Sequence, residues 1–92
     1  MAIGVYFHPV SMNAQQYNDI LRRLDAAGAG APKGRLYHCC FGEGNELQVF
    51  DVFDTQANLD AFAQVLVPIT AAANVDPGQP MVSPVQNIIV GT

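Results

Sequence analysis

Hydrophobic and polar positions follow two different periods along the chain. Apolar, β-branched and aromatic residues fill residues 2–8, 35–41, 47–53 and 85–90, a pattern typical of β-strands. Between these segments, apolar residues recur three and four positions apart, as on one face of a helix. The two sets are Tyr17, Ile20, Leu21 and Leu24, and then Leu59, Phe62, Ala63 and Leu66. The predicted order is therefore strand, helix, strand, strand, helix, strand.

Residues that cap or break helices give the expected boundaries. Ser11 is a suitable N-cap for the first helix, and Gly28 ends it within a flexible Gly/Ala link. Asp54 or Thr55 is expected to cap the second helix. Pro68 lies inside the second apolar pattern and predicts a kink or an end there, because proline lacks the backbone N–H. A Pro/Gly loop is expected over residues 74–84.

The element order predicts a ferredoxin-like fold. The turn at residues 42–46 is so short that the strands on either side must be antiparallel neighbours. The whole order, βαββαβ, is the split βαβ pattern. We expect one α+β domain over residues 1–92, with both helices on one face of a four-stranded antiparallel sheet.

The second face of the predicted sheet is also apolar and is expected to be buried. Apolar residues occupy both alternating positions of the predicted strands, whereas a sheet with one solvated face alternates more cleanly. Hydrophobic residues make up 50% of the chain and charged residues only 13%, which leaves much apolar surface on so small a domain. We therefore expect a homodimer in which a second subunit covers this face.

Charge and composition exclude several classes of partner. The net charge is −4, and only four residues are Lys or Arg, so nucleic acid and anionic membranes are not expected partners. No apolar run approaches the roughly 18–20 residues that span a bilayer, and no signal peptide is recognisable. Cys39 and Cys40 are neighbours whose side chains should point to opposite faces of a strand. We expect reduced thiols and a cytoplasmic protein.

The run DVFDTQANLDAFAQVL, residues 51–66, resembles the dimeric α/β-barrel superfamily, and most of all its antibiotic-biosynthesis-monooxygenase-like members and their uncharacterised relatives. In that family an acidic residue and a Trp often end the third strand, and Phe53 stands at the Trp position. The resemblance implies a dimer with its two sheets face to face and a pocket beside each sheet. Some members oxidise polycyclic phenols with O₂ and no cofactor, whereas others degrade haem, isomerise lactones or only bind ligands.

Three polar residues within the apolar strands are the candidate catalytic groups: His38, Asp51 and Asn87. A histidine beside a carboxylate can act as a general base, with the carboxylate fixing its tautomer. An asparagine can hold a developing oxyanion. We expect His38 and Asp51 to line a cavity on one face of the hairpin rather than to lie beneath the helices. The structural alternative is a hydrogen-bonded core or interface histidine with Asp51 as its acceptor.

Further candidates for substrate binding are Tyr6, His8, Tyr37 and Phe53. By the resemblance, Phe53 and Asp51 face the pocket. His8, next to Pro9, suits a rim position, and the two tyrosines could equally be packing residues with solvated hydroxyls. No metal-ligand spacing, phosphate loop, dinucleotide motif or haem-binding set is recognisable, so we expect no cofactor.

Two functions remain open from the sequence. One is a cofactor-independent monooxygenase-like or isomerase-like enzyme acting on a small aromatic or apolar substrate. The other is a non-catalytic dimer of the same fold that binds a small ligand or has a structural role. The His, Asp and Asn within apolar strands favour the enzyme, and the lack of Trp and of basic residues favours the binding module.

Overall fold

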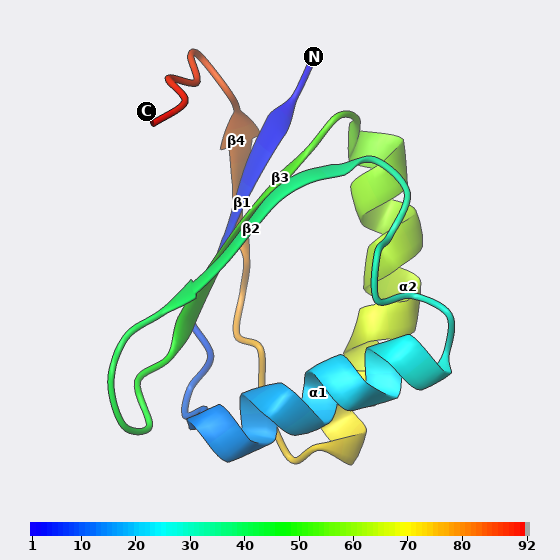
Figure 1. The fold of residues 1–92 in the computed structure, drawn as a ribbon, viewed down its shortest axis with the longest axis vertical. Helices are drawn as coiled ribbons and strands as arrows, with labels where there is room; N and C mark the ends of the chain where they lie inside the picture. Colours follow the sequence, from blue (N-terminus) through cyan, green and yellow to red (C-terminus); the bar gives the residue numbers. More distant parts are fainter. Residues whose placement is uncertain (92) are drawn as a thin grey trace.

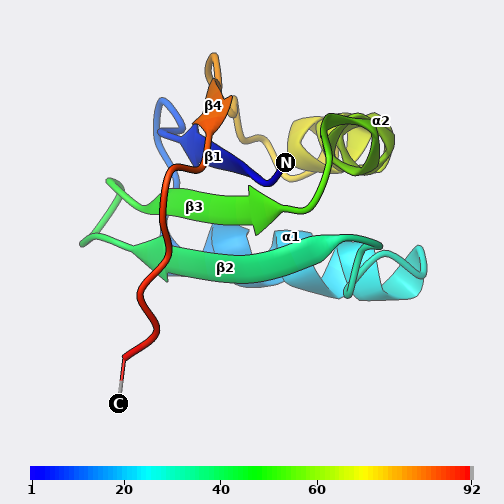
Figure 2. The same ribbon diagram turned by 90° about the horizontal axis from the view of Figure 1, so that it is seen from above.

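The computed structural model describes residues 1–91, which form one four-stranded sheet with two helices on one face (Figures 1 and 2). The elements are β1 (Ile3–Phe7), α1 (Ala14–Ala26), β2 (Arg35–Phe41), β3 (Gln48–Phe53), α2 (Gln56–Ala72) and β4 (Met81–Pro84). The strand order is β2-β3-β1-β4, and every neighbouring pair is antiparallel. The predicted ferredoxin-like α+β fold is confirmed.

The register of the sheet sets which side chains face the helices. Val5 of β1 lies opposite Asp51 of β3, and Asp51 in turn lies opposite His38 of β2. Val5 is completely buried and Asp51 is only 2% exposed, so this row of residues runs beneath the helices. Phe53 is on the same face, two residues beyond Asp51, and its ring centroid is 5.7 Å from that of Phe62 on α2.

A β-bulge interrupts β2 near its start. Arg35 pairs with Phe53, but Tyr37 pairs with Val52, which leaves Leu36 as the extra residue. Residues three apart on a regular strand would face opposite sides. Because of the bulge, Arg35 and His38 instead both lie on the helix side of the sheet.

The first helix begins later than predicted, with Asn13 as its N-cap in place of Ser11. The Asn13 side chain accepts from the N–H of Gln16, and the Gln16 side chain accepts from the N–H of Asn13, which forms a capping box. Met12 is held extended against the β2–β3 turn, where its N–H donates to the carbonyl of Asn45. This pairing explains why the helix cannot begin at Ser11. The helix ends as expected, with Gly28 in the left-handed region at φ 75°.

The second helix runs through its proline. Of the two predicted caps, Asp54 and Thr55, it is Thr55 that caps α2, by accepting from the N–H of Asn58. The helix continues to Ala72 with Pro68 inside it, so the prediction that it could end at the proline is not met. Thr70, in the last turn of the helix, is buried and donates its hydroxyl to the Val67 carbonyl.

The last strand is not where the sequence pattern placed it. It spans Met81–Pro84, inside the predicted loop, and residues 85–90 are outside the sheet and mostly exposed. The register explains this, because Pro84 already lies opposite Ile3 and the Val85 N–H donates to the Ala2 carbonyl. The residues that follow extend past β1, so the apolar run 88–90 has no neighbouring strand to pair with.

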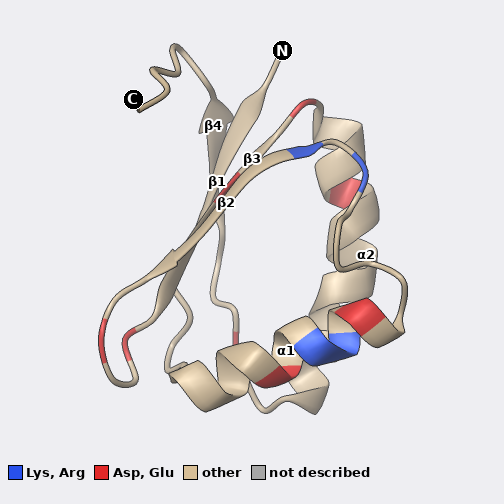
Figure 3. Cartoon of the chain, viewed as in Figure 1, with Lys and Arg blue, Asp and Glu red and all other residues tan. Residues whose placement is uncertain are grey.

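Charged residues are sparse and occur mainly on the helices, in the turns and near the ends of the strands (Figure 3). Arg22 and Arg23 are on α1, where both contact Asp19, and Lys33 and Arg35 are close together in the sequence at the start of β2. Among residues 1–91, no helix is long and apolar enough to cross a membrane.

Candidate functional site

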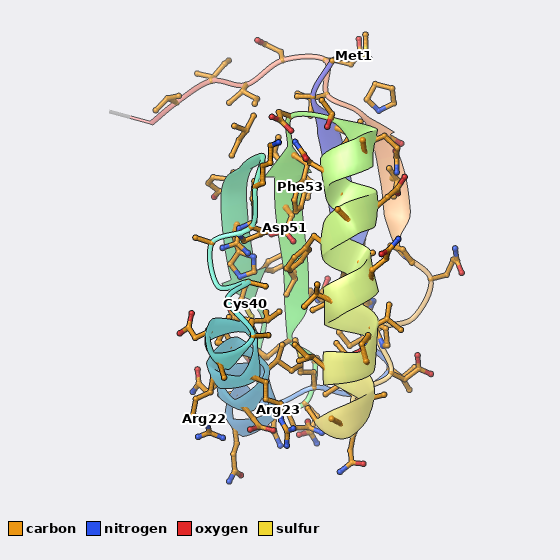
Figure 4. The ribbon with its side chains drawn as sticks, turned by 90° about the vertical axis from the view of Figure 1, so that its right-hand side faces the viewer. Met1, Arg22, Arg23, Cys40, Asp51 and Phe53 are labelled. Carbon is orange, nitrogen blue, oxygen red and sulfur yellow. The ribbon has the colours of Figure 1, made fainter. Side chains whose placement is uncertain are left out.

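A small cavity of about 60 Å³ lies between the sheet and both helices. Its walls are mainly apolar, and its titratable or polar side chains come from α1, α2 and the hairpin. These five are Tyr17, Arg35, His38, Asp51 and Thr70. Figure 4 shows Asp51 and Phe53 on β3, seen from the helix side of the sheet. An apolar cavity with a few convergent polar groups is the usual form of a small-molecule site.

Three of these side chains form one hydrogen-bonded chain. Asp51 Oδ1 is 2.5 Å from His38 Nδ1, and His38 Nε2 is 2.6 Å from the Tyr17 hydroxyl. The rings of Tyr17 and His38 are nearly parallel, at an interplanar angle of 4°. These hydrogen bonds thus connect β3, β2 and α1, and they cross the layer that the cavity occupies.

The carboxylate determines the tautomer of the histidine. An ionised carboxylate can only accept hydrogen bonds, so His38 Nδ1 carries the proton that is donated to Asp51. In the neutral imidazole, Nε2 is then unprotonated and accepts from the Tyr17 hydroxyl. This is the arrangement in which a histidine can take up a proton at Nε2, while the carboxylate stabilises the imidazolium that results.

The hydrogen-bonded side chains of Asp51 and His38 differ in how far they are buried. The Asp51 side chain is 3% exposed and that of His38 is 24% exposed. A carboxylate buried to this extent is costly unless it is hydrogen-bonded, and His38 supplies that bond. The more open position of His38 leaves it accessible from the cavity side.

The pKa of Tyr17 is raised above its usual value of 10.0, first by burial and then by the nearby Cys40 and Asp51. Arg35 acts in the opposite direction. The hydroxyl therefore stays protonated at neutral pH and acts as a hydrogen-bond donor to His38. Burial also raises the pKa of the Cys40 thiol, so Cys40 is not set up as a thiolate nucleophile.

The structure places the predicted site residues in three groups. His38, Asp51 and Phe53 are on the helix side of the sheet, and the first two line the cavity. The expectation that His38 and Asp51 would not lie beneath the helices is wrong, because the cavity is itself beneath the helices. That Phe53 and Asp51 share a face is confirmed by their register against Ile3 and Val5.

Tyr6, Tyr37 and Asn87 are not part of this cavity. Tyr6 alternates with Val5 and faces the outer side, where its hydroxyl donates to Gln48. Tyr37 is on the same outer side and packs beside Phe50. Asn87 follows β4 and lines a separate outer groove with Tyr6. Asn87 is thus not brought to His38, because the chain leaves the sheet at Pro84 on the far side of β1.

His8 lies at the end of β1, half exposed, and its Nε2 is 3.6 Å from a Glu46 carboxylate oxygen. It is not among the cavity-lining residues. The two cysteines are free, and their partners across the hairpin, Phe50 and Val49, place them on opposite faces as predicted. Among residues 1–91, no group of three or more His, Cys, Asp or Glu side chains is placed to hold a metal ion.

Sequence reasoning did not select Tyr17 or Arg35. The helical spacing of Tyr17 predicts only a place on the apolar face of the first helix, although a tyrosine in such a face usually needs a partner for its hydroxyl. The strand pattern places Arg35 only at the start of a strand. Its orientation depends on the bulge at Leu36, for which the sequence carries no recognisable signal.

The size of the cavity limits what it can hold. A cavity that accepts benzene in a protein core measures about 150 Å³, and this one measures about 60 Å³. A single ring therefore enters only if side chains move or if part of the ligand protrudes. A polycyclic substrate does not fit the present shape.

The fold is that of antibiotic-biosynthesis-monooxygenase-like proteins, as the resemblance implied. A cofactor-independent oxygenase from Streptomyces nogalater, SnoaB, matches in a variant form with a TM-score of 0.69 and 12% identity over 96% of each chain. A provisionally named antibiotic biosynthesis monooxygenase from Chloroflexus aurantiacus matches with a TM-score of 0.64 and 14% identity, covering 99% of this chain and 100% of that one.

A second provisionally named antibiotic biosynthesis monooxygenase, from Caulobacter crescentus, has a TM-score of 0.64 and 16% identity, covering 96% of this chain and 91% of its own. At these identities the likeness shows a shared fold and not a shared reaction. No model of a known protein family matches the sequence. No curated protein matches it either.

Proposed function

We propose that this protein is a cofactor-independent, monooxygenase-like enzyme acting on a small, largely apolar substrate with an acidic proton. The observation that carries the proposal is the Asp51–His38 pair, held at 2.5 Å within an apolar cavity. The fold shared with the cofactor-independent oxygenase SnoaB is consistent with it. In this proposal His38 is the general base, and Asp51 orients it and stabilises its charged form.

The base starts a reaction that needs only O₂ as co-substrate. His38 Nε2 removes the acidic proton and leaves a substrate anion, which is electron-rich enough to be oxidised by O₂. For a substrate CH₂ group, one oxygen atom becomes a carbonyl oxygen and the other leaves as water with the two hydrogens. Substrate carbon is oxidised, O₂ is reduced, and His38 returns its proton to the departing oxygen. The apolar walls shield the anion from water.

The Tyr17 hydroxyl is hydrogen-bonded to His38 Nε2, the atom that must accept the substrate proton. A substrate hydroxyl reaches His38 either by taking the place of the Tyr17 hydroxyl or by passing its proton through it. Tyr17→Phe separates the two routes, since displacement predicts an unchanged or faster reaction and relay predicts a slower one. Both routes keep His38 as the base.

A binding module remains the second candidate, and one observation favours it. His38 already has a partner on both ring nitrogens, in Asp51 and Tyr17, which is also the arrangement of a purely structural histidine. The cavity of about 60 Å³ is small for a substrate ring. In this case the site sequesters a small ligand, or only connects α1 to the sheet.

A panel of small phenols and quinols, incubated with purified protein, O₂ and a chelator, tests the enzyme proposal. Oxygen uptake and product formation are measured for the parent, His38→Ala and His8→Ala. A general base contributes roughly 10²–10⁴ in rate, so His38→Ala should lose about that much while His8→Ala, outside the cavity, keeps full activity. If no compound is turned over, or if His38→Ala matches the parent, the binding module is the better description.

We propose in addition that the outer face of the sheet is covered by a second copy of this chain. Large apolar side chains remain exposed there, notably Tyr37 at 54%, Phe41 at 45% and Met81 at 66%. A patch of this kind on a small domain is typical of an interface. A dimer formed through it would leave the cavity intact, because the cavity is on the opposite side of the sheet.

A further inference from the structure

We propose that the cavity is built for an anionic ligand, a small apolar carboxylate whose carboxylate group binds Arg35. This inference rests on the proposed function for the location of the substrate, and it adds the substrate class. It does not require that the bound molecule be turned over.

The β-bulge in β2 is what brings Arg35 to the cavity. With regular alternation, a strand that turns His38 toward the helices would turn Arg35 away from them. The extra residue, Leu36, restores Arg35 to the helix side, where it lies opposite Phe53 and lines the cavity. Bulges often re-aim a side chain next to a functional site. Leu36 itself is turned out and exposed, so the bulge gains no burial for the extra residue.

The guanidinium has unused hydrogen-bonding capacity. Its Nη2 donates to the Gly30 carbonyl at 3.2 Å, which anchors one side of the group. A guanidinium carries five N–H donors. Within residues 1–91, none of the ion pairs involves Arg35, whereas Arg22 and Arg23 both contact Asp19. Arg35 is thus a half-buried cation whose charge has no carboxylate partner in this part of the chain.

The other charges at the cavity favour an anion beside Arg35. Asp51 is hydrogen-bonded to His38. It pairs with His38 across the hairpin, whereas Arg35 pairs with Phe53, two residues further along β3. The remaining lining residues are neutral and mostly apolar. A ligand carboxylate would receive two parallel N–H bonds from the guanidinium, the geometry that arginine favours. Its apolar body would then extend along the walls toward His38.

Binding of matched anionic and neutral molecules tests this arrangement. The probes are isobutyrate and benzoate, each compared with its own amide, and inorganic phosphate as an anion without an apolar body. Affinity is measured by calorimetry, and the position by NMR shifts of the His38 and Arg35 side chains. The variants are Arg35→Gln, Arg35→Lys and, as a control with the same change in net charge, Lys33→Gln, which does not line the cavity.

The expected result is that the carboxylates bind more tightly than their amides, that phosphate does not bind, and that ligand shifts occur at both Arg35 and His38. Hydrogen bonds to a charged group contribute about 1.5–3 kcal/mol, so Arg35→Gln should weaken carboxylate binding about ten- to a hundredfold. Arg35→Lys should restore part of it, and Lys33→Gln should change nothing.

Equal binding of acid and amide, the same loss in Lys33→Gln as in Arg35→Gln, or no carboxylate binding at all would overturn the inference. Tight binding of phosphate would identify a general anion site instead, and would also overturn it. None of these results tests His38 as the proposed base, because the oxidation of a neutral phenol by O₂, with His38 as the base, is measured separately. Conversely, carboxylate binding at Arg35 without any turnover would support this inference and remove the enzyme proposal.

Discussion

The Tyr17 hydroxyl and Nε2 of His38 are 2.6 Å apart, which joins the first helix to the edge strand at the one ring nitrogen that Asp51 leaves free. The same contact has two consequences. It fixes how α1 lies over β2, and it occupies the atom through which His38 would act as a base. Under the proposed mechanism the stability and the activity are therefore coupled at Tyr17, and changes there should separate a structural histidine from a catalytic one.

Replacing His38 should destabilise the fold more than removing the charge of its partner, Asp51. His38→Leu leaves the Asp51 carboxylate buried without its partner, and we expect a loss of about 2–4 kcal/mol in the free energy of unfolding. Asp51→Asn removes the charge and keeps an acceptor for His38 Nδ1, so its cost should be smaller, about 1–2 kcal/mol. Urea denaturation at neutral pH measures both.

The double variant His38→Leu, Asp51→Leu is the control for this pair. It leaves no buried charge, so it should be more stable than His38→Leu alone. If the single and double variants were equally unstable, the cost would come from lost packing and not from the unpaired carboxylate.

Tyr17 should make the protein sensitive to alkaline pH. Its pKa in the folded state is raised above 10.0, mainly by burial, so the folded protein holds this proton more tightly than the unfolded chain does. The resulting stability is fully present below pH 10 and is lost as the pH rises from there through the folded-state pKa. Tyr17→Phe should lose this part of the alkaline decline.

The measurement is the free energy of unfolding at pH 8 and at successive values above pH 10, for the parent and Tyr17→Phe. Tyr37→Phe is the matched control, because that ring is on the other face of the sheet from Tyr17 and does not line the cavity. A decline in Tyr17→Phe as steep as in the parent would assign the alkaline sensitivity to other groups.

The pattern of apolar residues was sufficient for the element order and for the hairpin, because the periods of 2 and 3.6 are strong wherever one face is buried. It failed at residues 85–90, where an apolar, strand-like run has no strand beside it. Local composition cannot reveal that Pro84 has already reached the start of β1. Ser11 failed as a cap for a similar reason, since a distant contact between Met12 and the hairpin turn holds the chain extended.

Two of the five polar side chains at the cavity could be predicted from the sequence. His38 and Asp51 stood out as ionisable residues in apolar strands, and the register brings them together. Arg35 could not be assigned, because a bulge of one residue reverses its face. Asn87 was assigned to the wrong neighbourhood once the last strand had been placed four residues too late.

The turn that sets this register depends on a glycine. Gly42 has φ 120°, and a Cβ at this position would lie 2.5 Å from the Glu46 carbonyl oxygen. Gly44 also has a positive φ, of 56°, but a Cβ there meets nothing within 4 Å. Gly42→Ala should therefore destabilise the hairpin clearly more than Gly44→Ala, for which the conformational cost alone is about 1–2 kcal/mol.

Thermal or urea denaturation of the two variants measures this difference, and the NMR shifts of His38 report whether the Asp51 contact persists. We expect Gly42→Ala to disturb His38 as well, because the pairing of β2 with β3 holds the two side chains opposite each other. Equal stability of the two alanine variants would show that the turn tolerates a side chain at Gly42 by moving the Glu46 carbonyl.

Dimer formation through the outer face should be sensitive to a single charge placed on it. Sedimentation of the parent at micromolar concentration should give a dimer, with an interface above about 1,200 Å² in total. Tyr37→Lys puts a charge into the exposed apolar patch, on the edge strand β2, and should shift the equilibrium to monomers, because an unpaired charge in an interface is costly to desolvate. Val67→Lys, at a similarly exposed apolar position on α2, should leave the dimer unchanged.

A stable parent monomer would remove the dimer proposal. If only Val67→Lys gave a monomer, the interface would instead lie on the helices.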